Sequence, residues 1–155
     1  MVLRTLSIVL VLAGCSTKYQ EMGFSGGVSA QQMIADTFRI VARGNGHTDT
    51  TTIRDYAMLS AAETTKKSGG THFILIGGED ASRVGQIDMP GSSRTTFSGN
   101  TASTTYSPAE SIPVFKPGQD IYIRVLTLKP GEIAPEGAIA AEEIIHFVGK
   151  RVDRG

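Results

Sequence analysis

An alternating pattern of apolar and polar residues predicts the first strand of the chain at residues 37–43. Phe38 and Ile40 fall on one face of this strand, while Arg39 and Arg43 fall on the other. Such alternation is typical of a strand that buries one face against a core. We therefore expect the folded part of the chain to begin with this strand.

Apolar positions that recur every three to four residues predict one long helix over residues 51–68. Asp49 lies where a helix N-cap is expected, and the glycines at 69–70 stop the helix. The inner face carries mainly small side chains, so we expect the helix to lie close against a sheet. On the outer face, we expect Glu63 to pair with Lys67 one turn later.

A nearly continuous apolar run at residues 72–76 predicts a central strand. With the strand at 37–43 and the helix at 51–68, it forms a β-α-β unit. If the two strands of this unit belong to one sheet, they run parallel, whether or not they are neighbours.

The second half of the chain adds further elements. Residues 120–128 form the longest predicted strand, and both faces become apolar toward its end, so we expect that end to be buried. Residues 112–115 predict a short edge strand, because Pro113 cannot donate a ladder hydrogen bond. The pattern at residues 138–148 favours a helix, and a final strand is the alternative.

Residues 91–107 interrupt this pattern, because ten of the seventeen residues are Ser or Thr. Residues 95–97 and 101–106 can pair as a polar hairpin, or the stretch can stay unstructured, since only Phe97 and Tyr106 offer much to bury. A solvated insertion is the default interpretation. A flap that binds a partner is the functional alternative.

Together these elements predict an α+β fold, with a small mixed sheet of three to five strands, one long helix and a C-terminal helix packed on it. A single domain over residues 37–151 accommodates them, with the Ser/Thr-rich insertion at about 91–107. This length is sufficient for one hydrophobic core.

Residues 15–36 are mostly small and polar, so we predict a flexible tether before the domain. They include Gly23-Phe24-Ser25-Gly26-Gly27, which matches the Gly-x-Ser-x-Gly pattern of a hydrolase nucleophile elbow. That elbow requires a strand before it and a helix after it, on a large sheet. Because a tether precedes Ser25 and the chain is short for such a sheet, we assign these residues to the tether.

The charge balance and the scarcity of chemical motifs exclude several function classes. The chain has 15 Lys and Arg and 15 Asp and Glu, whereas nucleic-acid binding needs a basic surface. His47, His72 and His146 are scattered, without an HExxH or CxxC pattern. No spacing suggests a nucleophile–base pair or a carboxylate pair. We therefore predict no nucleic-acid partner, no catalytic residue, no metal, no cofactor and no enzyme activity.

The clearest motif lies near the N-terminus. Arg4 precedes an apolar run at residues 6–12, which is too short to span a bilayer as a helix. Small residues follow, and Cys15 is the single cysteine of the chain. The stretch Leu12-Ala13-Gly14-Cys15 resembles the lipobox of bacterial lipoproteins, in which the cysteine is lipidated and the chain is cut just before it.

This resemblance implies a signal peptide at residues 1–14, a diacylglyceryl group on the thiol of Cys15, and a further chain such as palmitate on its freed amine. Two or three acyl chains hold a protein firmly on a membrane. In Gram-negative sorting, an Asp directly after the cysteine typically retains a lipoprotein at the inner membrane. Ser16 occupies this position, which implies lipid anchoring at the periplasmic face of the outer membrane.

Several stretches of the first half form a second resemblance: Gly23-Phe24-Ser25, Thr37-Phe38-Arg39-Ile40, Arg43-Gly44-Asn45-Gly46, Asp55-Tyr56-Ala57-Met58-Leu59, and Ala61-Ala62-Glu63 leading to Phe73-Ile74-Leu75-Ile76. Together they resemble a group of small proteobacterial envelope lipoproteins with no assigned reaction. The resemblance covers roughly residues 23–76 and implies a location without a mechanism.

Two function classes follow. The first is a non-catalytic envelope lipoprotein, a structural, adaptor or sensor component that binds another envelope protein. The second is a small periplasmic hydrolase that acts on cell-wall material. A hydrolase needs a recognisable catalytic pair, so the first class is favoured.

Overall fold

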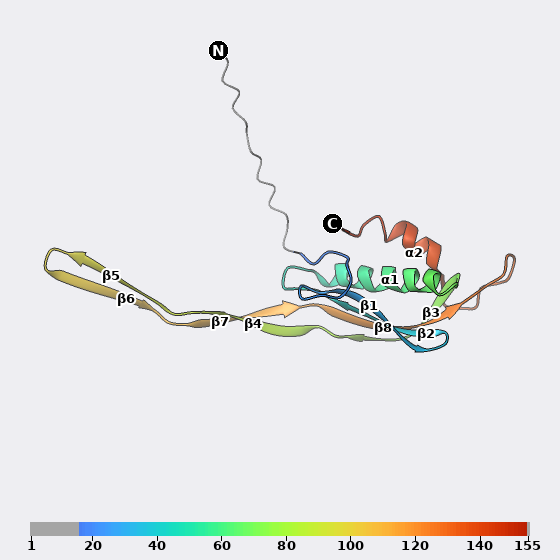
Figure 1. Cartoon of the computed structure of the whole chain (residues 1–155), viewed down its shortest axis with the longest axis horizontal. Coiled ribbons are helices and arrows are strands. Elements are labelled where there is room, and N and C mark those ends of the chain that lie inside the picture. Colours follow the sequence, from blue (N-terminus) through green and yellow to red (C-terminus); the bar gives the residue numbers. More distant parts are fainter. Residues whose placement is uncertain (1–15, 155) are drawn as a thin grey trace, which may run out of the picture.

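A computed structural model describes residues 16–154, and its body is a five-stranded sheet with one long helix on one face and a short C-terminal helix packed on that long helix (Figure 1). The strand order is β1 (Gly27–Ile34), β2 (Thr37–Arg43), β8 (Gly118–Leu126), β3 (His72–Asp80) and β9 (Ala138–Ala140). The helices are α1 (Thr50–Lys67) and α2 (Ala141–Phe147). The predicted α+β class is confirmed. The sheet is not mixed, however, because every neighbouring pair of strands is antiparallel.

Strand β8 lies between β2 and β3 and is antiparallel to both. Strands β2 and β3 therefore run in the same direction without touching each other, as the β-α-β pattern allows. A strand from the C-terminal half of the chain thus occupies the centre of the sheet.

The hydrophobic core fills the layer between the sheet and α1. Ile40, Phe73 and Ile123 from the sheet are fully buried in one cluster with Ile53 and Tyr56 of the helix. Each buried side chain of this size stabilises the fold by about 1.5–3 kcal/mol relative to exposure. Small helix residues between them allow the close approach that the sequence predicts.

The ends of α1 follow the predicted capping signals. The Asp49 side chain accepts a hydrogen bond from the Thr52 backbone N–H at 2.9 Å, which satisfies one of the free donors of the first turn. Beyond the C-cap Ser68, Gly69 adopts φ +78°, a left-handed conformation that favours glycine.

The tether predicted for residues 15–36 is wrong for the described part, because this stretch folds onto the body. Thr17 is buried, and its carbonyl accepts a hydrogen bond from the Tyr56 hydroxyl at 2.8 Å. Residues 27–34 then form β1 at the edge of the sheet. An edge strand needs few apolar residues, and only Gly27 and Val28 of β1 are buried, so the sequence carries no strand signal here.

Two predictions about the C-terminal half need correction. The start of β8 is buried and its end is not, because β2 pairs with β8 only as far as Arg124. Residues 138–148 contain both a strand and a helix. Residues 138–140 form β9, which pairs with β3, and α2 begins directly afterwards at Ala141.

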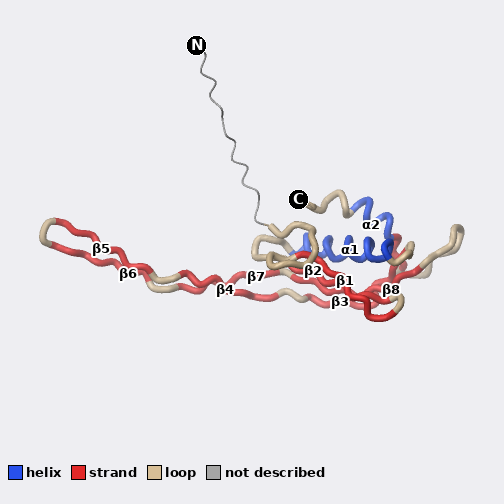
Figure 2. Tube along the Cα trace, viewed as in Figure 1, coloured by secondary structure: helices blue, strands red, loops and turns tan. Residues whose placement is uncertain are grey.

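A long two-stranded ribbon leaves the sheet from the ends of β3 and β8 (Figure 2). Its strands are β4 (Arg83–Met89) paired with β7 (Glu110–Lys116), and β5 (Ser92–Ser98) paired with β6 (Thr101–Ser107). We call residues 83–116 the arm. The hairpin alternative for residues 91–107 is therefore correct, but the ribbon is longer than that stretch and includes the predicted edge strand at 112–115.

Candidate functional site

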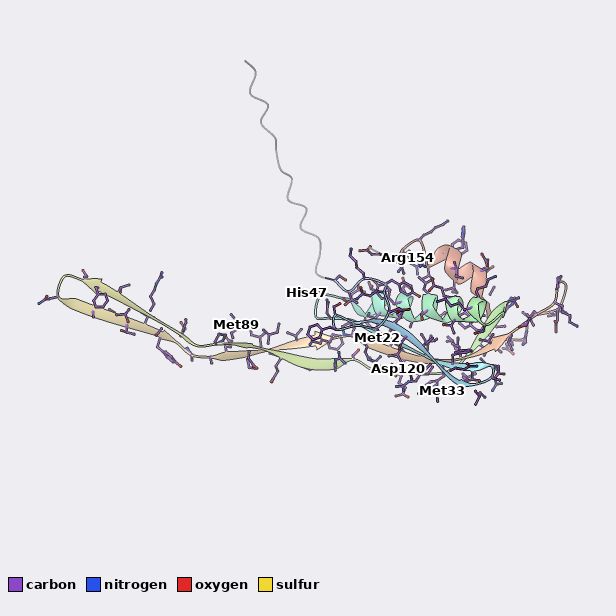
Figure 3. The ribbon with its side chains drawn as sticks, viewed as in Figure 1. Met22, Met33, His47, Met89, Asp120 and Arg154 are labelled. Carbon is purple, nitrogen blue, oxygen red and sulfur yellow. The ribbon has the colours of Figure 1, made fainter. Side chains whose placement is uncertain are left out.

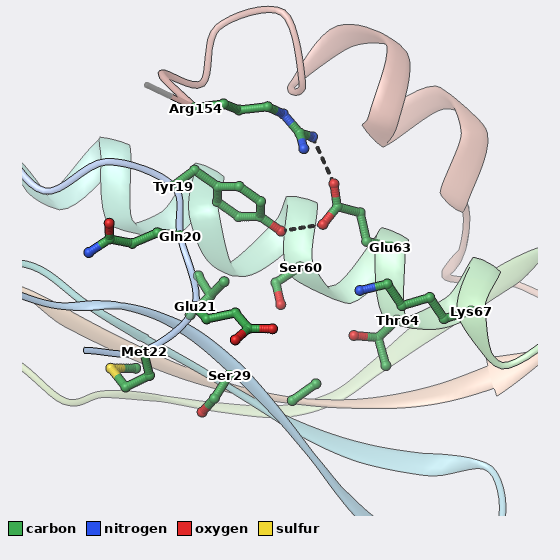
Figure 4. Close-up of a pocket in the computed structure, with 12 residues that line it drawn as sticks. Tyr19, Gln20, Glu21, Met22, Ser29, Ser60, Glu63, Thr64, Lys67 and Arg154 are labelled. Atoms are coloured by element: carbon green, nitrogen blue, oxygen red, sulfur yellow. Dashed lines mark hydrogen bonds and ion pairs between the residues drawn. The ribbon is translucent and has the colours of Figure 1, made fainter.

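Beside the edge of the sheet, β1 and α1 border a groove of about 680 Å³ (Figure 4). Ser29 and Ala30 line the groove from β1, and Glu63 and Lys67 line it from α1. Residues 19–22 also line this groove. We call this space the β1 groove.

The Glu63 carboxylate of α1 binds one residue near each end of the described chain, Tyr19 and Arg154. The Tyr19 hydroxyl donates a hydrogen bond to Glu63 Oε2 at 2.6 Å, and Arg154 Nη2 donates to Glu63 Oε1 at 2.7 Å. The Arg154 guanidinium also lies 5.1 Å from the centroid of the Tyr19 ring. The predicted pairing of Glu63 with Lys67 is wrong, because partners from distant segments bind Glu63 instead.

The phenol of Tyr19 is held in its neutral form. Burial raises the pKa of this hydroxyl above its usual range, and the hydrogen bond to Glu63 and the charge of Glu63 raise it further. Tyr19 is therefore a fixed hydrogen-bond donor at neutral pH and cannot act as a base.

Two charged side chains of the groove are free to contact a ligand. Within residues 16–154, Glu21 and Lys67 form no ion pair with another side chain, so both charges are available to a ligand. The same part of the chain has no group of three His, Cys, Asp or Glu residues that could hold a metal ion.

The three histidines lie apart from the β1 groove. His72 Nδ1 is 2.9 Å from the Thr71 hydroxyl, and His146 Nε2 is 3.1 Å from Lys150 Nζ. His47 lies in the loop before α1 (Figure 3). These contacts assemble neither a histidine–serine nor a histidine–carboxylate pair. Ser25 lies in a turn that leads into β1, so it lacks the strand-to-helix setting of a nucleophile elbow.

A second charged cluster lies on the face of the sheet away from the helices (Figure 3). Asp120 is only 2% exposed, and both Arg39 and Arg43 of β2 bind its carboxylate. Burial alone raises the pKa of Asp120, but the hydrogen bonds and charges of the two arginines outweigh it and hold the pKa below its usual range. All three polar groups are satisfied, so this cluster joins β2 to β8 and is structural.

Of the residues predicted from the lipobox, Cys15 lies outside the described part of the chain, and its lipidation stays a prediction. Ser16, the predicted sorting residue, is the first described residue and is exposed. It borders a small cavity of about 180 Å³ beside the ion pair of Asp55 and Arg151. No helix within residues 16–154 combines the length and the hydrophobicity needed to cross a bilayer.

The arm is the second candidate site, because it exposes large apolar side chains along its length. The exposed residues are Val84, Ile87, Met89, Phe97, Tyr106, Ile112 and Phe115. A two-stranded ribbon has no second layer against which these side chains can pack, and such ribbons are marginally stable alone. Exposed apolar surface of this kind typically marks an interaction site.

Strand register groups these residues by face. Ile87 lies directly opposite Ile112, and Met89 lies on the same face two residues further along β4. Phe97 and Tyr106 share one face of the outer ribbon, because each lies an even number of residues from the pair Thr95 and Thr104.

No sequence pattern predicts the β1 groove, because its walls come from segments far apart in the chain. The cluster at Asp120 does have a sequence signal, since Arg39 and Arg43 recur on the polar face of one strand, where a buried acid can pair with them.

No protein-family model, no curated protein and no solved structure matches this chain.

Proposed function

We propose that this protein is a lipid-anchored, non-catalytic component of the bacterial envelope, and that its arm binds another envelope protein. The arm supplies the observation that carries the proposal. Residues 83–116 form a ribbon that projects from the body (Figure 1). Seven large apolar side chains of this ribbon are exposed. A partner that covers even some of them gains about 1.5–3 kcal/mol for each side chain it fully buries.

The anchor in this proposal is Cys15, within the lipobox-like stretch at residues 12–15. Lipid on this residue holds the body at a membrane surface, and Ser16 in place of Asp favours the periplasmic face of the outer membrane. A protein held on a membrane meets its partner in a confined layer, which raises the effective concentration of both.

The contacts of two carboxylates, Asp120 and Glu63, support a binding role. The most buried carboxylate, Asp120, is neutralised by two arginines, and Glu63 is engaged by Tyr19 and Arg154. A general acid or base needs a carboxylate or imidazole free to reach a substrate, and neither Asp120 nor Glu63 is free in this way. The exposed surface of the arm, in contrast, is free for a partner.

Co-purification from crosslinked membranes tests the proposal. We expect Ile87→Thr combined with Ile112→Thr to lose the partners that the wild-type protein retains, because it removes an apolar pair but keeps β-branched residues. Ile133→Thr is the matched control, since Ile133 is 92% exposed in the loop between β8 and β9, outside the arm. Equal recovery of the same partners by all three proteins would reject the arm as the binding element.

A further inference from the structure

The free edge of β1 is the starting point of a second inference. Val28 directs both of its backbone groups away from β2: its N–H donates to the Gln20 carbonyl at 2.8 Å, and its carbonyl accepts from the Met22 N–H at 2.8 Å. Residues 20–22 therefore already lie on this edge as a short extended segment, bridged in parallel to β1.

The same edge continues without a partner. Backbone groups alternate in direction along an antiparallel ladder, so Ala30 and Gln32 face outward as Val28 does. In the part of the chain that the structure describes, no backbone hydrogen bond covers either residue. Both residues are exposed, so their donors and acceptors are open to a ligand.

The composition of β1 does not protect this edge. Natural edge strands avoid unwanted pairing with charged residues, proline or very short length. Strand β1 has eight residues, none of them charged or proline, and it ends with the exposed pair Met33 and Ile34. Its single irregularity is a register shift between Gln32 and Ile34. An edge of this kind is suited to accept another strand.

We infer that the β1 groove binds an extended segment of a partner polypeptide, which pairs with Ala30 and Gln32 as an additional strand. The chain's own residues 20–22 show that a lone extended segment fits this edge. The groove of about 680 Å³ between β1 and α1 receives the alternate side chains of the bound segment. Glu21 and Lys67 face them from opposite sides (Figure 4).

This site is separate from the arm, and it extends the proposed function to a second contact. Main-chain pairing provides affinity, whereas the side chains in the groove provide the choice of segment. Because no residue of the arm lines the groove, the site can be tested whether or not the arm binds a partner.

A displayed library of short linear peptides, selected against the full-length protein in detergent, provides the probe. We expect a selected synthetic peptide to slow hydrogen exchange at the amides of Ala30 and Gln32. The inference would be overturned if the peptide protected only the arm, or if the protection came from pairing of two protein copies. Failure to select any binding peptide would overturn it as well.

Substitution at Ala30 tests the same contact by affinity. Ala30→Pro removes the outward N–H without removing a bond to β2, and proline is tolerated on the open side of an edge strand. We expect it to weaken peptide binding about tenfold, because the peptide carbonyl loses its donor. Ala30→Ser keeps the N–H and should bind like wild type. Equal affinities of the two variants would overturn the inference, and the exchange experiment decides the question if Ala30→Pro does not fold.

Discussion

At the scale of single residues, Asp120 is the polar group on which the sheet depends most. Its carboxylate is buried at the centre of the sheet, and Arg39 and Arg43 bind it from the neighbouring strand. A buried charge is tolerated only when its partners replace the water that it loses. Removing one member of this cluster leaves the others without compensation.

We predict that Asp120→Asn lowers the free energy of unfolding by about 1.5–3 kcal/mol, because the charge-assisted hydrogen bonds from two partly exposed arginines are lost. Urea denaturation followed by circular dichroism measures the change. Asp88→Asn is the matched control, since Asp88 lies exposed in β4 and binds only the Ser111 hydroxyl. A similar effect of both substitutions would contradict the role assigned to Asp120.

The contribution of Asp120 also depends on pH. Its pKa is lower in the folded protein than in the unfolded chain, where an Asp has a pKa of about 3.9. The stability that the ionised Asp120 carboxylate contributes is therefore complete above about pH 3.9. It is lost as the pH falls through the pKa that Asp120 has in the folded protein. We expect the difference in unfolding free energy between wild type and Asp120→Asn to be constant near neutral pH and to shrink below about pH 4. A difference that stays constant in acid would contradict this assignment.

At the scale of elements, the sequence predicts those that are buried on one face and misses those at the edge. Strand β2 alternates apolar residues with arginines, and helix α1 repeats its buried positions every three to four residues, so both have a clear sequence pattern. Strand β1 has five exposed residues in succession, so no periodic pattern marks it. The length of the arm was missed for the same reason, since both faces of a ribbon are exposed.

The arm should be dispensable for folding of the body. Within the described residues, no member of the hydrophobic core belongs to residues 83–116. Replacing them with a short Gly-rich turn keeps the hydrogen bond from the Ala81 N–H to the Gly118 carbonyl. We expect the free energy of unfolding to change by less than about 1 kcal/mol.

Urea denaturation of the shortened protein checks this prediction, and peptide binding at the β1 groove should be unchanged. A loss of several kcal/mol would show that the arm belongs to the core structure, and the arm could then not act as an independent binding element.

At the scale of the whole molecule, the arm and the β1 groove lie apart, and we propose each as a separate binding surface (Figures 1 and 4). The fold class could be predicted from periodicity. The groove could not, because it forms only when residues 19–22, helix α1 and Arg154 come together. A motif made of adjacent residues, such as the one at Cys15, is the kind of feature that a sequence alone can provide.

The lipid anchor predicts two distinct changes in membrane attachment. Cys15→Ala should leave an unprocessed precursor without lipid, because no other thiol is present in the chain. Ser16→Asp should leave lipidation intact but move the protein to the inner membrane. Labelling with a fatty-acid analogue followed by membrane fractionation measures both. An unlabelled wild-type protein would contradict the anchor, whereas a labelled protein at the inner membrane would contradict only the sorting.

Site-specific photo-crosslinking in intact cells tests directly whether the arm binds another protein. A photoreactive residue replaces Phe97, which is 78% exposed on the arm, and in a second protein it replaces Ile133 outside the arm. We expect position 97 to yield a discrete crosslinked protein partner and position 133 to yield no partner in common with it. The same partners from both positions, or crosslinks from position 133 alone, would contradict it.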